Sequence, residues 1–271
     1  MPVWEIMAFA AAIGAAGVFS GLLAGVFGIG GGAILVPVFY QVLGMLGVDE
    51  SVRMHISVGT SLAIIIPTSL RSFQAHHARG VVDMDLLKSL VVPVPVGVIL
   101  ASLVAAYLSS EELRAVFAII ALVMALRLLF NRDSWRLGTE IPGNPARAII
   151  GVVMGFFSTL MGIGGGIMNN TFMSLYGRPM HQAVATSSGV GVLIAIPGTV
   201  GYIAAGWSNP LLPIGSTGYV NWIAFAAIIP VAMVVTPLGV RIAHAMEKRQ
   251  LEIGFGLFCL FVAIRFMISL A

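Results

Sequence analysis

Long runs of apolar residues, separated by short polar turns, dominate the pattern along this chain. Several of these runs reach or approach about 18 residues, the length that an α-helix needs to cross the hydrocarbon core of a bilayer. The pattern therefore predicts an all-α polytopic membrane protein. The main runs are Ile6–Phe27, Ile56–Ser69, Leu90–Leu108, Leu113–Leu126, Ala183–Ala205, Ile223–Val240 and Ile253–Leu270.

Two of the hydrophobic stretches contain the same five residues, GIGGG, at Gly28–Gly32 and Gly162–Gly166. Glycine inside a helix costs about 1 kcal/mol relative to alanine, so each cluster predicts a helix break. A break at membrane depth is tolerated only where protein or a water-filled cavity surrounds it. The first amides of the helix that follows each break lack intrahelical partners and favour an anion. We therefore expect the substrate at Gly30, Gly31, Gly32, Gly164, Gly165 and Gly166; close packing between helices is the alternative.

Further short matches appear when the two glycine clusters are superimposed, which predicts two related halves. The stretch between the two halves, Asn131–Arg147, is the most charged part of the chain and the richest in Pro and Gly, as expected of a linker. We predict a first membrane repeat at residues 1–130, a cytoplasmic linker at 131–147 and a second repeat at 148–271, within one integrated transmembrane domain. The matching pairs are VGTS (Val58–Ser61) with VATS (Val184–Ser187), RGVVDM (Arg79–Met84) with TGYVNW (Thr217–Trp222), and LRLL (Leu126–Leu129) with IRFM (Ile264–Met267).

The loops carry positive charge unevenly, which predicts an orientation. Each half holds about five apolar segments, and an odd number of crossings inverts the second half relative to the first. With alternate crossings, one set of loops carries most of the Lys and Arg residues, while the other carries only Arg53 and Arg114. The positive-inside rule places the basic loops in the cytoplasm and both termini outside. The expected fold is thus two inverted-topology repeats, with discontinuous or re-entrant helices at the glycine clusters.

A few polar side chains lie within the apolar runs and are candidates to complete an anion site. Asn169 and Asn170 directly follow the second glycine cluster, and Arg71 is the basic residue placed nearest the expected pathway. Each has a structural alternative, because Asn can join helices, hydroxyls can bond to their own helix and Arg can extend to the interface. No Asp or Glu is expected deep in a span. The shared TS pairs add Thr60, Ser61, Thr186 and Ser187 to the site.

Composition narrows the class of protein further. Hydrophobic residues make up 59% of the 271 residues and charged residues only 9%, whereas ordinary soluble domains have roughly 25% charged residues. The net charge of +3 is small and scattered, so nucleic acid is not an expected partner. The single cysteine excludes an intrachain disulfide, and we expect neither a cofactor nor a metal. We also expect no enzyme, because no HExxH motif, paired carboxylates or Ser-His-Asp set occurs at matching depth.

The duplicated GIGGG, the Val36–Pro37 pair, GTSL at Gly59–Leu62 and ATSS at Ala185–Ser188 resemble the TauE/SafE family of sulfite exporters. The likeness covers nearly the whole chain. It implies a polytopic transporter of small sulfur-containing anions such as sulfite, sulfoacetate or related organosulfonates. Carried over to this sequence, it points to both glycine clusters and the two TS pairs.

The leading hypothesis is a secondary transporter of the cell membrane, an exporter of sulfite or an organosulfonate. The anion would be held at helix N-termini near the midplane, and the two repeats would alternate access. The alternatives are an anion channel and a transporter of a small carboxylate. The expected partners are the bilayer and a small anion; a coupling proton or ion, and self-association, are left open.

Overall fold

The computed structural model describes residues 17–18, 21–22, 32–130, 137–245 and 248–270, and these residues are almost entirely helical. A two-stranded antiparallel hairpin precedes α10 and pairs Ser216 with Asn221. The elements are α2 (Gly32–Met45), α3 (Glu50–Ala78), α4 (Met84–Leu90), α5 (Pro93–Tyr107), α6 (Ser110–Leu129), α7 (Ala146–Met161), α8 (Gly166–Leu175), α9 (Met180–Ala205), β1 (Ser216–Thr217), β2 (Val220–Asn221), α10 (Trp222–Ala245) and α11 (Lys248–Ile268).

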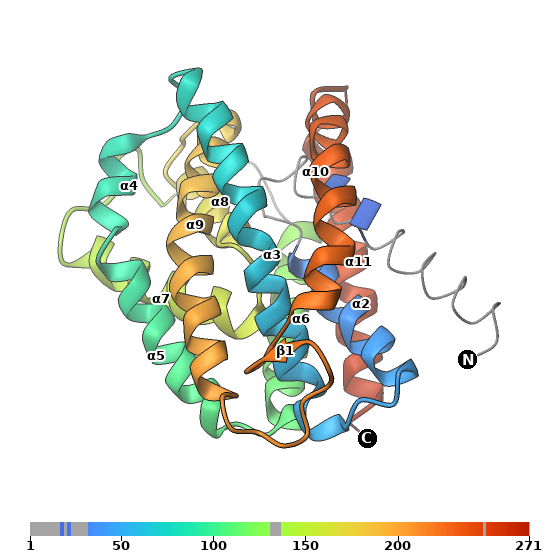
Figure 1. Ribbon diagram of the computed structural model, residues 1–271. Coiled ribbons are helices and arrows are strands. Elements are labelled where there is room, and N and C mark those ends of the chain that lie inside the picture. Colours follow the sequence, from blue (N-terminus) through green and yellow to red (C-terminus); the bar gives the residue numbers. More distant parts are fainter. Residues whose placement is uncertain (1–16, 19–20, 23–31, 131–136, 246–247, 271) are drawn as a thin grey trace.

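The two longest helices, α3 and α9, lie side by side in the middle of the molecule (Figure 1). Helices α4, α5 and α7 cover one side of this pair, while α2, α10 and α11 lie on the other, with α6 packed along α11. The upper end in Figure 1 holds the turn between α3 and α4, and the lower end holds the hairpin. The polar side chains of the predicted site therefore lie mostly on the central helices or on elements that contact them.

Helix length and composition agree with a membrane protein. Among the described residues, α3 and α9 are each long and apolar enough to cross a bilayer. Helices α4 and α5 meet the same criterion together, with a bend of 42° at the break between them. Shorter apolar helices cover Ile34–Met45, Ala146–Met161 and Trp222–Val235. The first predicted run, Ile6–Phe27, lies almost wholly outside the described residues.

The outward faces of the helices are apolar. Ile99 and Leu103 on α5 are 53% and 57% exposed, and Val123 on α6 and Phe261 on α11 are 57% and 63% exposed. In water, continuous apolar faces of this kind would drive aggregation, whereas lipid chains cover them at no cost. Interior packing must then come from close contact between helices rather than from expulsion of water.

Glycine provides that close contact between α5 and α7. A Cβ atom on Gly97 would lie 2.0 Å from the Val152 carbonyl oxygen, and one on Gly155 would lie 2.2 Å from that of Val94. The two backbones therefore touch where neither helix carries a side chain. In the first half, Gly21 approaches α10 in a similar way, because its Cβ would lie 2.9 Å from the Ala232 carbonyl oxygen.

Replacing Gly155 with Leu is expected to separate α7 from α5. The loss of stability should exceed the ~1–3 kcal/mol typical of overpacking, because the obstacle is a backbone carbonyl that cannot change rotamer. Thermal unfolding of the purified protein in detergent measures this. Gly254→Leu in α11 is the matched control, since nothing lies within 4 Å of its added Cβ. Equal losses in the two variants would contradict the close-packing interpretation.

Candidate functional site

The first residue of α2 meets the second glycine cluster at the middle of α3. A Cβ atom on Gly32 would lie 2.2 Å from the Gly162 carbonyl oxygen and 3.0 Å from Ser61 Oγ. The Ser61 hydroxyl donates a 2.8 Å hydrogen bond to the same carbonyl, inside the protein. One residue from each glycine cluster and one TS serine thus form a single contact. Gly30 and Gly31 lie outside the described residues.

The chain leaves the helical conformation at the second cluster. Helix α7 ends at Met161, and Gly162 follows in the left-handed conformation with φ of +64°. The N–H groups of Gly162 and Ile163 donate to the Thr159 and Ser158 carbonyls, the pattern of a Schellman cap. Gly165 is also left-handed, with φ of +50°. Only glycine adopts this conformation without strain, so the residue type and the break belong together.

Helix α8 begins at Gly166 with free amides. Its first intrahelical bond runs from the Asn169 N–H to the Gly165 carbonyl, and the Gly166 N–H bonds back to Gly164. Within the part of the chain that the structure describes, no hydrogen bond reaches the N–H groups of Ile167 and Met168. These amides, together with the positive end of the helix dipole, favour a negative charge.

The asparagines after the break bind a serine of α9. Ser187 Oγ accepts a 2.8 Å hydrogen bond from Asn169 Nδ2 and donates a 2.6 Å bond to Asn170 Oδ1. All three side chains are buried. The Asn169 Oδ1 atom is buried without a hydrogen-bond partner among the described residues. The structure thus brings the predicted site residues Asn169, Asn170 and Ser187 together, and Asn169 Oδ1 can still accept a hydrogen bond.

The two threonines of the TS pairs form hydrogen bonds with other segments than the adjacent serines do. Thr60 Oγ1 accepts the backbone N–H of Asn221, and Thr186 Oγ1 accepts that of Asp83, each at 2.9 Å. Asp83 and Asn221 each cap the helix that follows. The Asp83 side chain accepts the Leu86 N–H of α4, and the Asn221 side chain accepts the Ala224 N–H of α10. The threonine oxygens face these turns, and the structure does not bring them to the glycine break.

Arg71 also lies apart from the site. It follows Ser61 by ten residues in α3, which places it about 15 Å further along the helix, and it is exposed. By contrast, Ser69 belongs near the break. Its hydroxyl is buried without a partner among the described residues, and a Cβ on Gly191 would lie 2.6 Å from Ser69 Oγ and 3.5 Å from the Gly164 carbonyl oxygen. The sequence alone could have suggested Ser69 only as one of several hydroxyls in its run.

Carboxylates are closer to the interior than the sequence predicted. Glu252 on α11 is only 6% exposed, and Glu50 forms a 2.8 Å ion pair with the buried Arg114. Glu252 is therefore shielded by protein, although it lies only four residues after the start of α11 at Lys248. The charge pattern missed it because Glu252 comes soon after the Lys248–Arg249 turn, which looks like a surface loop. Among the described residues, no group of three His, Cys, Asp or Glu could hold a metal ion.

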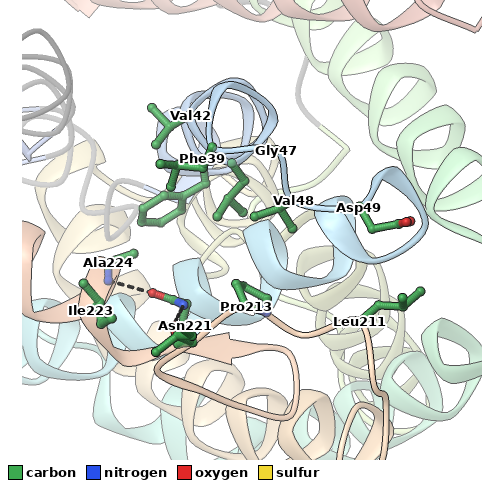
Figure 2. Close-up of a pocket in the computed structure, with 13 residues that line it drawn as sticks. Phe39, Val42, Gly47, Val48, Asp49, Leu211, Pro213, Asn221, Ile223 and Ala224 are labelled. Carbon is green, nitrogen blue, oxygen red and sulfur yellow. Dashed lines mark hydrogen bonds between the residues drawn. The ribbon is translucent and has the colours of Figure 1, made fainter. Parts of the chain in front are cut away.

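An apolar cavity of about 550 Å³ opens at the lower end of the molecule. Figure 2 shows Phe39, Val42 and Val48 on one side and Pro213, Asn221 and Ile223 on the other. Asn221 connects the cavity to the central helix, because its backbone N–H bonds to Thr60. The cavity is thereby linked to α3 through Asn221, and it is a candidate vestibule.

Asp49 is the acidic side chain that lines this cavity. The hydroxyl and the backbone N–H of Ser51 donate to its carboxylate, and these bonds hold the pKa of Asp49 below its usual value. The carboxylate therefore stays ionised at neutral pH, and the entrance carries a negative charge on one edge.

Known proteins resemble the chain along nearly its whole length. A "probable membrane transporter protein" of Haemophilus influenzae is 31% identical over 93% of this chain and 96% of its own length. Two further relatives are also described as probable membrane transporter proteins. The one from Methanocaldococcus jannaschii is 25% identical over 88% of this chain and 87% of its own length, and YunE of Bacillus subtilis is 26% identical over 87% of this chain and 89% of its own length. These names agree with the expectation that the chain is not an enzyme. No solved structure matches it.

The family comparison agrees with the relatives. The model of the sulfite exporter TauE/SafE family matches residues 13–266, which include both glycine clusters and both TS pairs. With its apolar outer faces and its interrupted helix, this chain is a membrane protein that belongs to the sulfite exporter TauE/SafE family.

Proposed function

We propose that the protein is a secondary transporter that exports a small sulfur-containing anion, sulfite or an organosulfonate such as sulfoacetate, across the cell membrane. The observation that carries the proposal is the interrupted segment between α7 and α8. Among the described residues, it leaves the N–H groups of Ile167 and Met168 without hydrogen-bond partners, beside the buried Asn169. Such amides bind oxyanions without a full positive charge, which suits a chain with few charged residues.

The two halves are proposed to be inverted-topology repeats, and reciprocal contacts between them support this. Thr60 of the first half binds the turn before α10, and Thr186 of the second half binds the matching turn before α4. Both turns contain a left-handed glycine, Gly80 with φ of +67° and Gly218 with φ of +54°. A two-fold axis in the membrane plane would relate the two halves in this way, because each contact of one half with the other is then repeated with the halves exchanged.

Glycine contacts repeat the same exchange. Gly151 and Gly155, which precede the second glycine cluster, approach α5 of the first half. Gly17 and Gly21, which precede the first cluster at the same spacing, approach α10 of the second half. In this proposal the upper end of Figure 1 faces the cytoplasm, because it carries most of the basic residues. The multi-pass chain then has both termini outside.

Transport by purified protein in liposomes tests the proposed function. Saturable uptake of labelled sulfite or sulfoacetate, accelerated by the same anion on the opposite side, is expected of a carrier. Single-channel currents would instead support an anion channel, and uptake restricted to small carboxylates would support the other alternative. No flux of any of these anions above that of empty liposomes would overturn the proposal.

Replacing Asn169 with Asp is expected to reduce sulfite uptake at least tenfold, because the added carboxylate repels an anion at the start of α8. Asn209→Asp is the matched control, since Asn209 lies in the loop between α9 and β1 and its side-chain oxygen still accepts from the Leu211 N–H. If Asn169→Asp does not fold, Asn169→Leu replaces it as the test, because Leu35 holds the equivalent place in the first half. Uptake at the wild-type rate in both Asn169 variants would exclude this residue from the pathway.

The inverted topology predicts opposite accessibility for two exposed turns. In a Cys259→Ala background, Ala78→Cys at the end of α3 should react with an impermeant maleimide only after the cells are permeabilised. Ser208→Cys, in the loop after α9, should react in intact cells. Both positions are exposed, so burial does not explain a difference. Labelling of both cysteines from the same side would contradict the proposed repeat.

A further inference from the structure

A small cavity of about 40 Å³, with polar and charged side chains among a mostly apolar lining, lies along α8, away from the larger apolar cavity beside Asn221. Four α8 residues line it, and their spacing of three or four residues places them on one face of the helix. The face runs from Ile167, whose N–H has no partner among the residues described, to Ser174 near the far end of α8, a rise of about 10 Å. The four residues are Ile167, Asn170, Thr171 and Ser174.

The opposite wall of the cavity carries charge. Arg127 on α6 and Glu252 on α11 both line it, and the Arg127 guanidinium donates a hydrogen bond to the Thr171 hydroxyl. The Glu252 carboxylate lies 3.6 Å from the Arg249 guanidinium. Arg249 is not part of the cavity lining. Among the described residues, Arg127 and Glu252 are the charged side chains that line the cavity, and their formal charges balance.

Arg249 caps the end of α6 and does not face the cavity. Arg249 donates to the Leu128 and Leu129 carbonyls at 2.9 Å and 2.6 Å, so the negative end of that helix is already occupied. Asn170 joins the cavity to the break, because it lines the cavity and accepts a hydrogen bond from Ser187. Asn170 therefore belongs both to the hydrogen-bonded cluster at the break and to the cavity lining.

The equivalent place in the first half is filled. Tyr40 follows Gly32 by eight residues, as Ser174 follows Gly166. The Tyr40 side chain is 6% exposed, and its hydroxyl accepts from Arg114 and donates to Glu50. Arg114 also corresponds to Glu252. It precedes Arg127 by thirteen residues, and Glu252 precedes Arg265, the match of Arg127, by the same number. A tyrosine thus fills the space on one side of the molecule, whereas a serine leaves it open on the other.

We propose that this cavity is a second anion subsite, in which Arg127 binds the oxyanion between the glycine break and the cytoplasm. Thr171, Asn170 and Ser174 supply further polar contacts, and Glu252 limits how tightly the anion is held. The inference deepens the proposed function and rests on it. It assigns a binding role to Arg127, an arginine near a helix end whose sequence position alone suggests an interfacial residue.

Arg127→Gln is expected to raise the KM for sulfite at least tenfold in proteoliposomes, with a smaller change in kcat. The variant removes a side chain that binds the anion and leaves the helices that move during transport unchanged. Arg127→Lys should be intermediate, since it keeps the charge and loses the planar fork. Arg265→Gln is the matched control, because Arg265 holds the equivalent position on α11 and is exposed. Equal KM values for wild type, Arg127→Gln and Arg265→Gln would overturn the proposal.

A second pair of variants tests the space itself. Ser174→Val should fill the cavity and slow transport at least fivefold, whereas Ser208→Val, in the exposed loop after α9, should stay within twofold of wild type. Wild-type rates in Ser174→Val protein that folds normally would contradict a subsite here.

Binding of sodium sulfite to the detergent-solubilised protein, measured by calorimetry, separates the two proposals. Binding that Arg127→Gln weakens, without any transport by the wild type, would refute the transporter and keep the subsite. Transport and binding that do not depend on Arg127 would refute the subsite and keep the transporter.

Discussion

A polypeptide in a bilayer must satisfy its backbone hydrogen bonds within the protein, and the rest of this structure depends on how that is done at one interruption. The chain stops being helical between Met161 and Gly166, at the centre of the molecule. The Schellman bonds at Gly162 satisfy the end of α7, and Ser61 of α3 satisfies the Gly162 carbonyl. Within the part of the chain that the structure describes, the N–H groups of Ile167 and Met168 at the start of α8 remain without partners, in protein rather than in lipid.

The same constraint explains the contacts between the two halves. The turns before α4 and α10 present backbone N–H groups toward the central helices, and a threonine from the opposite half accepts each one. Each half is thereby joined to the other at two separate turns. Under the proposed alternating access, a movement of one half against the other must either carry these turns with it or break the two bonds.

Recognition of an anion by amides explains how a transporter can work with so little charge. A deeply buried arginine is costly, whereas backbone N–H groups at a helix start are already present and need only be left without partners. In the proposed arrangement, full charge enters only at the cavity beside Arg127, nearer the end of the bundle. The asymmetry between Ser174 and Tyr40 places that cavity on one side of the molecule.

Residue type and local order determined much of this protein. The apolar runs predicted the helices, because hydrophobicity and helix length are properties of a single segment. The second glycine cluster predicted the interruption, because the cost of glycine in a helix and its freedom at positive φ are also local. The GIGGG and TS motifs predicted the family, which the comparison confirms.

Tertiary structure alone decided which groups meet. Thr60 and Thr186 looked like partners of Ser61 and Ser187, yet they accept backbone N–H groups that lie 161 and 103 residues away in the chain. Arg71 looked central and is exposed, whereas Glu252 looked peripheral and is buried. A hydrogen bond or a cavity depends on the crossing of helices that are distant in sequence, and no periodicity within one segment contains that information.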